Sequence, residues 1–193
     1  MEDYYIFWGI VIILLLWIIG VYNAIVQGKN AVERSWAGVI TQERQKNKIL
    51  PELEKLVKEY KDFEGNVLEE ISRLRSGMSK LSSDKIDPQL LSMLETQTNT
   101  LLNGIRLQVE NYPELKASEI YTNLMKELTE QQENIGAALR IFNQNVEAFN
   151  NLIQVFPNNL INKKLNKEEK IAVFYDSEAQ SGFEYQPAWQ SKG

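Results

Sequence analysis

The stretch that decides the fold runs from Ser118 to Phe156 and is SEIYTNLMKELTEQQENIGAALRIFNQNVEAFNNLIQVF. Its apolar residues recur at steps of three and four, with a mean spacing close to that of an α-helical turn. The stripe consists of Ile120, Leu124, Leu128, Gln131, Ile135, Ala138, Phe142, Val146, Phe149, Ile153 and Phe156. Pro157 follows directly and ends the helix. We therefore predict one long helix that packs this face against partner helices.

A second helix is predicted to begin at Pro88, because Asp87 is a typical N-cap and proline favours the first helical position. Pro113 is expected to end this helix near Asn111. Its buried face is predicted to contain Leu90 or Leu91, with Leu94, Thr98, Leu101, Ile105, Val109 and Tyr112. The flanking residues 80–86 and 112–117 are predicted to be loops.

A third helical stripe precedes residue 80. It consists of Trp36, Val39, Leu50, Leu53, Val57, Tyr60, Val67, Ile71, Leu74 and Met78. A polar patch from Glu43 to Lys48 interrupts it, and no Gly-Pro punctuation separates it from the chain before it until Pro51. We therefore predict one helix that continues from the N-terminal region to about Leu81, with a kink at Pro51.

The N-terminal region is the most apolar part of the chain. No charged residue occurs from Tyr4 to Gly28, and Ile6 to Val21 is almost wholly apolar. A helix of about 20 such residues spans a hydrocarbon core of roughly 30 Å. The sequence therefore predicts a single transmembrane helix. The predicted fold is all-α: this helix continues into an elongated antiparallel bundle of three long helices, followed by an extended C-terminal tail.

Two other interpretations of the apolar run are disfavoured. A cleaved secretory signal should begin with basic residues, but Glu2 and Asp3 are acidic. A buried core helix is disfavoured because Trp8 and Trp17 lie on differing faces of the run. Basic residues follow the span and none precedes it, which favours a cytoplasmic bundle with the N-terminus outside, although the opposite orientation stays open. These residues are Lys29, Arg34, Arg44 and Lys46.

Composition excludes several classes of function. The 193 residues contain no cysteine and no histidine, so disulfides, thiolate or imidazole metal ligands and a Ser-His-Asp triad are excluded. The net charge of -5 disfavours nucleic acid as a partner. The isolated glycines Gly104 and Gly136 form no phosphate-binding loop, and we expect them to mark close helix approaches.

Two groups of charged residues are candidate sites. Glu43, Arg44, Lys46, Lys48 and Glu52 form either a binding face near the membrane or a solvated helix face, and the pattern favours the solvated face. Six glutamates lie off the apolar stripes, without a histidine, and are predicted to be surface residues rather than a metal or acid-base site. They are Glu110, Glu114, Glu119, Glu127, Glu130 and Glu133. We predict no catalytic, cofactor-binding or metal-binding residue, no cofactor and no enzyme activity.

Three motifs are recognisable along the chain. They are Tyr22-Asn23 with Asn30, Val32 and Trp36; a basic stretch from Arg44 that ends in Ile49-Leu50-Pro51-Glu52-Leu53; and the run from Glu110 to Pro157, with Asn134, Arg140, Asn143 and Asn150. On these motifs the chain resembles the LemA family of bacterial membrane-anchored helical proteins, from Met1 to about Tyr175. It departs from the family pattern at Gln45, Lys46, Lys48, Glu52 and Phe142. The resemblance implies a long-helix bundle behind one membrane helix, and the family has no established enzymatic activity.

The helical patterns and the resemblance together predict three regions. They are a membrane helix at 1–28, a LemA-like helical bundle at 29–160 and a C-terminal tail at 161–193. In the tail, residues 163–170 are predicted to form a short helix. The residues after it are expected to extend over the bundle, with binding of a partner as the alternative. Four aromatic or proline residues near the end belong to the same expectation: Phe183, Tyr185, Pro187 and Trp189.

The predicted function is that of a membrane-anchored, non-catalytic scaffold or adaptor in the bacterial cell envelope. The alternative is a passive structural protein of the envelope. The expected partners are the lipid bilayer and either another protein or a second copy of the chain. Self-association is expected through surplus apolar surface at Trp36, Val39 and Ile40, and Arg140 is expected to pair with a carboxylate on a neighbouring helix.

Overall fold

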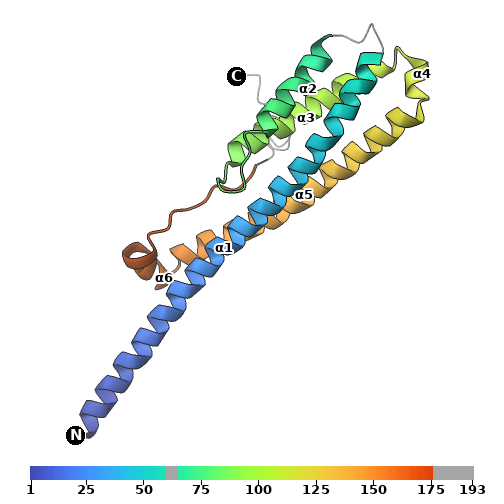
Figure 1. The fold of residues 1–193 in the computed structure, drawn as a ribbon. Helices are drawn as coiled ribbons and strands as arrows, with labels where there is room; N and C mark the ends of the chain where they lie inside the picture. Colours follow the sequence, from blue (N-terminus) through green and yellow to red (C-terminus); the bar gives the residue numbers. More distant parts are fainter. Residues whose placement is uncertain (60–64, 176–193) are drawn as a thin grey trace, which may run out of the picture.

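The two longest helices lie side by side and antiparallel (Figure 1). The computed structural model describes residues 1–59 and 65–175, and this part of the chain is helical and contains no strand. In chain order the elements are α1 (Glu2–Glu59), α2 (Gly65–Met78), α3 (Pro88–Val109), α4 (Pro113–Lys116), α5 (Glu119–Gln154), α6 (Asn158–Ile161) and a π-helical turn, η1 (Asn162–Asn166). α1 packs along α5, and α2 packs on both α1 and α3. The predicted all-α, elongated antiparallel bundle is confirmed.

The helical stripes found in the sequence form the hydrophobic core. On α5 the stripe is buried from Leu124 to Ile153, with Leu139 buried more deeply than Ala138. The prediction is wrong at the two ends of the stripe, because Ile120 and Phe156 are exposed. The predicted buried face of α3 is confirmed at Leu91, Leu94, Thr98, Leu101, Ile105 and Val109.

The predicted start of α3 is also confirmed. The Asp87 side chain accepts a hydrogen bond of 3.0 Å from the backbone N–H of Leu90, and Pro88 occupies the first helical position. The cap satisfies a donor that has no partner within the helix. The segment predicted as the loop 112–117 contains the one-turn helix α4, so that part of the prediction is wrong.

The first part of α1 projects from the bundle as a helix with exposed apolar side chains (Figure 1). Ile25 is the first buried side chain among those described in α1. At about 1.5 Å per residue, the projecting residues 4–24 are roughly 30 Å long, which matches the hydrocarbon thickness of a bilayer. Among the described residues this is the one helix long and apolar enough to cross a membrane.

The prediction of one helix running to about Leu81 is wrong. α1 continues through Pro51 and ends at Glu59, and α2 then folds back beside it. Tyr60, which the predicted stripe included, lies outside the described residues. The reversal has a physical cause: a straight continuation would leave the α2 stripe without a partner, whereas the return buries Ile71 and Leu74.

The surplus apolar surface expected at Trp36, Val39 and Ile40 is also absent. Trp36, Val39 and Ile40 are all buried within this chain, so they form no surface for a second copy. The Trp36 ring packs on Phe142 at 5.2 Å between centroids. Its indole N–H donates to the backbone oxygens of two loop residues, Ser82 at 2.9 Å and Lys85 at 3.1 Å. Trp36 therefore fastens the α2–α3 loop to α1.

Close helix approaches occur at glycines other than those predicted. A methyl group at Gly104 would meet no atom within 4 Å, and one at Gly136 would only approach the Arg140 side chain. A methyl group at Gly77 would instead overlap Leu94, and one at Gly28 would press on the α5 side chains. The tight contacts are therefore between α2 and α3 and between α1 and α5.

Candidate functional site

A lysine ammonium group lies inside the bundle with no solvent exposure. Lys46 on α1 lies within 2.8 Å of a Glu95 oxygen on α3 and 3.1 Å of a Glu43 oxygen on α1. The ammonium group also donates a hydrogen bond of 3.2 Å to the Thr98 hydroxyl. A buried charge needs such compensation, because removing it from water costs several kcal/mol. The four side chains form what we call the buried charge cluster.

The cluster contains two carboxyl groups for one ammonium, and the environment of Glu43 resolves this imbalance. Burial raises the pKa of Glu43 to about 8; the Lys46 charge opposes the shift and the neighbouring Glu95 reinforces it. A hydrogen bond between the Glu43 and Glu95 carboxyl groups also favours the protonated form of Glu43, because two carboxyl groups can share a hydrogen bond only if one of them keeps its proton. At neutral pH Glu43 is therefore mainly protonated, and one ammonium faces one carboxylate.

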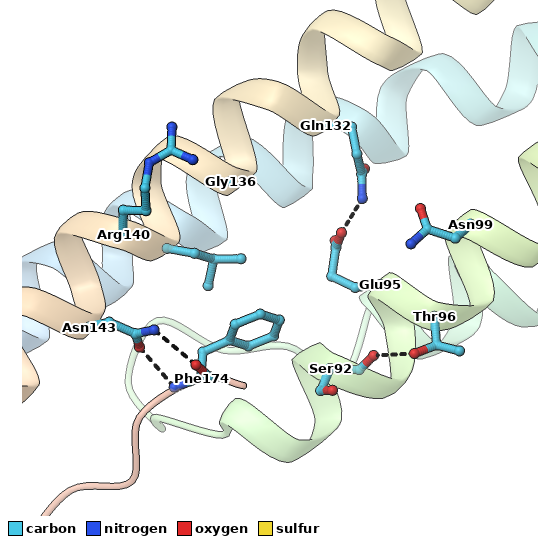
Figure 2. Close-up of a pocket in the computed structure, with 10 residues that line it drawn as sticks. Ser92, Glu95, Thr96, Asn99, Gln132, Gly136, Arg140, Asn143 and Phe174 are labelled. Carbon is cyan, nitrogen blue, oxygen red and sulfur yellow. Dashed lines mark hydrogen bonds between the residues drawn. The ribbon is translucent and has the colours of Figure 1, made fainter. Parts of the chain in front are cut away.

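Glu95 links the buried charge cluster to an open cavity between α3 and α5. One of its oxygens faces Lys46, and the other accepts a hydrogen bond from the Gln132 side chain of α5 (Figure 2). The cavity has a volume of about 410 Å³. Its lining is Ser92, Glu95, Thr96, Asn99, Gln132, Gly136, Leu139, Arg140, Asn143 and Phe174. We call it the α3–α5 cavity.

The C-terminal tail reaches the edge of this cavity, where asparagine side chains hold its backbone. Asn143 donates to the backbone oxygen of Phe174 and accepts from its N–H, both at 2.8 Å (Figure 2). Asn150 makes the same pair of bonds with Ile171, at 2.8 and 3.0 Å. A side-chain amide that bonds both backbone groups of one residue recognises an extended chain without reading its side chains.

A third asparagine repeats the arrangement one step earlier in the tail. Asn162 bonds the oxygen and the N–H of Glu168 at 2.9 and 3.0 Å. The clamped tail residues are thus three positions apart. On α5, Asn143 and Asn150 are seven residues apart, a rise of about 10.5 Å, which matches the reach of about 10 Å for three extended residues. The tail runs antiparallel to α5, and this matching of lengths lets the two clamps act together.

The clamps stop where the α3–α5 cavity begins. Seven residues before Asn143 the helix carries Gly136, which has no side chain to continue the series. Gly136 and Phe174 both line the cavity. Among the described residues the cavity therefore lies beside the last clamped residue, Phe174, and the backbone oxygen of the next residue, Tyr175, accepts a hydrogen bond of 3.2 Å from Ser92 of α3.

The structure separates the residues that the sequence grouped as a polar patch. Glu43 and Lys46 are buried, so the expectation of a solvated face is wrong for them, whereas Arg44, Lys48 and Glu52 are exposed as expected. The partner that makes burial possible, Glu95, was not identified from the sequence because it lies on another helix.

The other candidate residues lie at the surface or at the rim of the cavity. The six glutamates predicted to lie at the surface are all exposed, so this prediction is confirmed. Asn134 is exposed, and Arg140 lies at the cavity rim without a salt bridge to any carboxylate in the described part of the chain, so the expected ion pair is absent there. The clamping role of Asn143 and Asn150 was missed; their seven-residue spacing beside the stripe was the available signal.

The tail itself differs in part from its prediction. The short helix predicted over 163–170 is confirmed only as far as Asn166, where η1 ends, and Lys167 adopts a left-handed backbone conformation. The expected extension over the bundle is confirmed for residues 171–175. Phe183, Tyr185, Pro187 and Trp189 lie outside the described residues.

A family comparison covers both the bundle and the tail. Residues 35–184 match the model of the LemA family, which is well over half of the chain. The chain belongs to the LemA family. The match contains the buried charge cluster, the α3–α5 cavity and all three asparagine clamps. It begins after the projecting helix.

A named relative supports the same assignment. The chain is 28% identical over 160 residues to a protein of Metamycoplasma hominis called Protein LemA. The alignment covers 83% of this chain and 71% of that LemA protein. That name states no activity.

Proposed function

We propose that this LemA-family chain is a membrane-anchored, non-catalytic adaptor whose α3–α5 cavity receives a segment of a partner protein. The observation that carries the proposal is the pair of clamps at Asn143 and Asn150. They hold an extended polypeptide by its backbone, and the cavity lies directly beside the held segment. A surface that already binds one extended chain of unspecific sequence is suited to binding another beside it.

The chemistry of the cavity fits a polypeptide partner. The side-chain oxygen of Gln132 in its wall accepts no hydrogen bond from the described residues, and Arg140 adds a positive charge at the rim. Such groups can satisfy the backbone and polar side chains of a bound peptide. The buried charge cluster, by contrast, serves stability: its ammonium group is fully enclosed and does not face the cavity.

The proposal includes anchoring through the projecting part of α1. The length of residues 4–24 and their exposed apolar side chains support a transmembrane helix. The basic residues after it support a cytoplasmic bundle with the N-terminus outside. The adaptor would then hold its partner within a few nanometres of the membrane surface.

Site-specific photocrosslinking in cells tests this proposal. A photoreactive amino acid replaces Arg140 at the cavity rim in the full chain, and the matched control carries it at Asn134, an exposed position on another face of α5. The proposal predicts a discrete protein adduct from position 140 that position 134 does not give. An adduct with the mass of two copies identifies self-association instead.

The same experiment can also refute the proposal. If neither position gives a discrete adduct, or both give the same diffuse set, the α3–α5 cavity is not a docking site. The alternative, a passive structural protein of the envelope, then accounts for the molecule better.

A further inference from the structure

A cluster of exposed apolar side chains follows the end of α5. Phe156 has 78% of its surface exposed, and three neighbours are about half exposed: Val155, Leu160 and Leu165. Phe156 continues the α5 stripe in sequence yet packs against nothing in the core. Exposed apolar clusters of this kind mark contact surfaces in soluble and membrane-associated proteins.

The cluster lies at the level where the projecting helix meets the bundle. The Asn166 side chain donates to the backbone oxygen of Tyr22, at 3.3 Å, and Lys29 forms a salt bridge of 2.8 Å with Glu168. Both α6 and η1 pack on α1 (Figure 1). Tyr22 lies in the last turn before Ile25, the first buried side chain described in α1. A bilayer crossed by residues 4–24 would therefore end beside η1.

The same segment is basic, in contrast to the acidic chain as a whole. Three exposed lysines lie on or next to η1: Lys163, Lys164 and Lys167. None of them forms a salt bridge within residues 1–59 and 65–175. The nearby Glu168 is already paired with Lys29. An apolar cluster beside unpaired lysines is the pattern of a segment that lies in a membrane interface.

We propose that residues 155–167 form a second membrane contact, in which Phe156, Leu160 and Leu165 enter the interface and the lysines bind anionic lipid headgroups. The proposal depends on the anchoring proposed above. A lipid surface is the occupant because the transmembrane helix fixes this segment at the bilayer boundary, and because the lysines complement anionic headgroups. The contact would fix the tilt of the bundle, and with it the side on which the α3–α5 cavity faces the cytoplasm.

Fluorescence quenching by nitroxide-labelled lipids tests the contact on the full chain. The chain has no cysteine, so single variants carry one environment-sensitive label each. Leu160→Cys reports on the proposed contact, Ile13→Cys on the transmembrane helix, and Glu114→Cys on α4 at the far end of the bundle. The proteins are reconstituted in vesicles of phosphatidylcholine with phosphatidylglycerol and in vesicles of phosphatidylcholine alone.

The proposal predicts that shallow nitroxides quench the label at 160 in anionic vesicles, while the label at 114 is unaffected and that at 13 is quenched by deep nitroxides. Changing Lys163, Lys164 and Lys167 to glutamine should lower the membrane-contact equilibrium constant by about fivefold per lysine. The same change at Lys126, an exposed lysine on α5, is the matched control and should have no effect.

Each other outcome is decisive. Quenching at 13 with none at 160 overturns the second contact and leaves the anchor intact. An unquenched label at 13 overturns both proposals. Shielding of the label at 160 in lipid-free detergent that rises with protein concentration assigns the cluster to a second copy of the chain and overturns the lipid contact.

Discussion

Replacing Glu43 by glutamine should remove a pH dependence that the buried charge cluster imposes on the fold. Glutamine has the shape of the neutral carboxyl group, so it mimics the protonated form of Glu43. The pKa of Glu43 is about 8 in the folded chain, against a usual value of 4.5. Between pH 4.5 and pH 8, Glu43 therefore keeps its proton in the folded state and has lost it in the unfolded state.

This difference in bound protons sets the direction in which the free energy of unfolding changes with pH. Because the folded state binds more protons, the free energy of unfolding falls as pH rises, by up to about 1.4 kcal/mol per pH unit. The contribution of Glu43 is fully present below pH 4.5 and is lost as pH rises toward 8. Between pH 5 and pH 8 the unmodified chain should lose roughly 3 kcal/mol relative to Glu43→Gln.

The assay is urea denaturation of the full chain in mild detergent at several pH values, followed by far-ultraviolet circular dichroism. Glu52→Gln, an exposed glutamate on the same helix, is the matched control and should differ from the unmodified chain by a small, constant amount. If the difference between the unmodified chain and Glu43→Gln is the same at pH 5 and pH 8, Glu43 is ionised in the fold. The account of the cluster is then wrong.

Three further predictions concern single elements of the fold. Lys46→Met should lower the free energy of unfolding by about 3 kcal/mol in the same assay, because it leaves the partly buried Glu95 carboxylate without its cation. Asn143→Ala should speed limited proteolysis of the tail several-fold, since it removes two hydrogen bonds, whereas Gln144→Ala at the exposed neighbouring position should not. Gly77→Ala should lower the thermal midpoint through overlap with α3, while Gly104→Ala, which meets no atom, should raise it.

The sequence was sufficient where a pattern is local. The spacing of apolar residues located α5 and α3, and Asp87 with Pro88 marked the start of α3 correctly. These features depend on residues within a few helical turns of one another, so periodicity and capping rules apply directly. The length and apolarity of the projecting helix are also local features that the sequence shows directly.

The sequence was insufficient where a partner lies far along the chain. Lys46 is buried because Glu95 and Thr98, some fifty residues later, compensate its charge, and a one-dimensional pattern cannot show that pairing. The end of α1 was missed for a related reason: the stripe continues at helical steps from Val57 to Val67, although the chain reverses between them. The asparagine clamps bind backbone groups of the tail, which leave no signature in its side chains.

The central claim is that the α3–α5 cavity receives a partner, and filling the cavity tests it most directly. Gly136→Leu places a side chain in the cavity, whereas Gly104→Leu adds the same side chain where a methyl group meets no atom within 4 Å. Each is combined with the photoreactive residue at position 140, and the yield of the partner adduct is measured in cells. The account predicts that Gly136→Leu abolishes the adduct and that Gly104→Leu leaves it intact at equal helical content. An undiminished adduct in Gly136→Leu would contradict it.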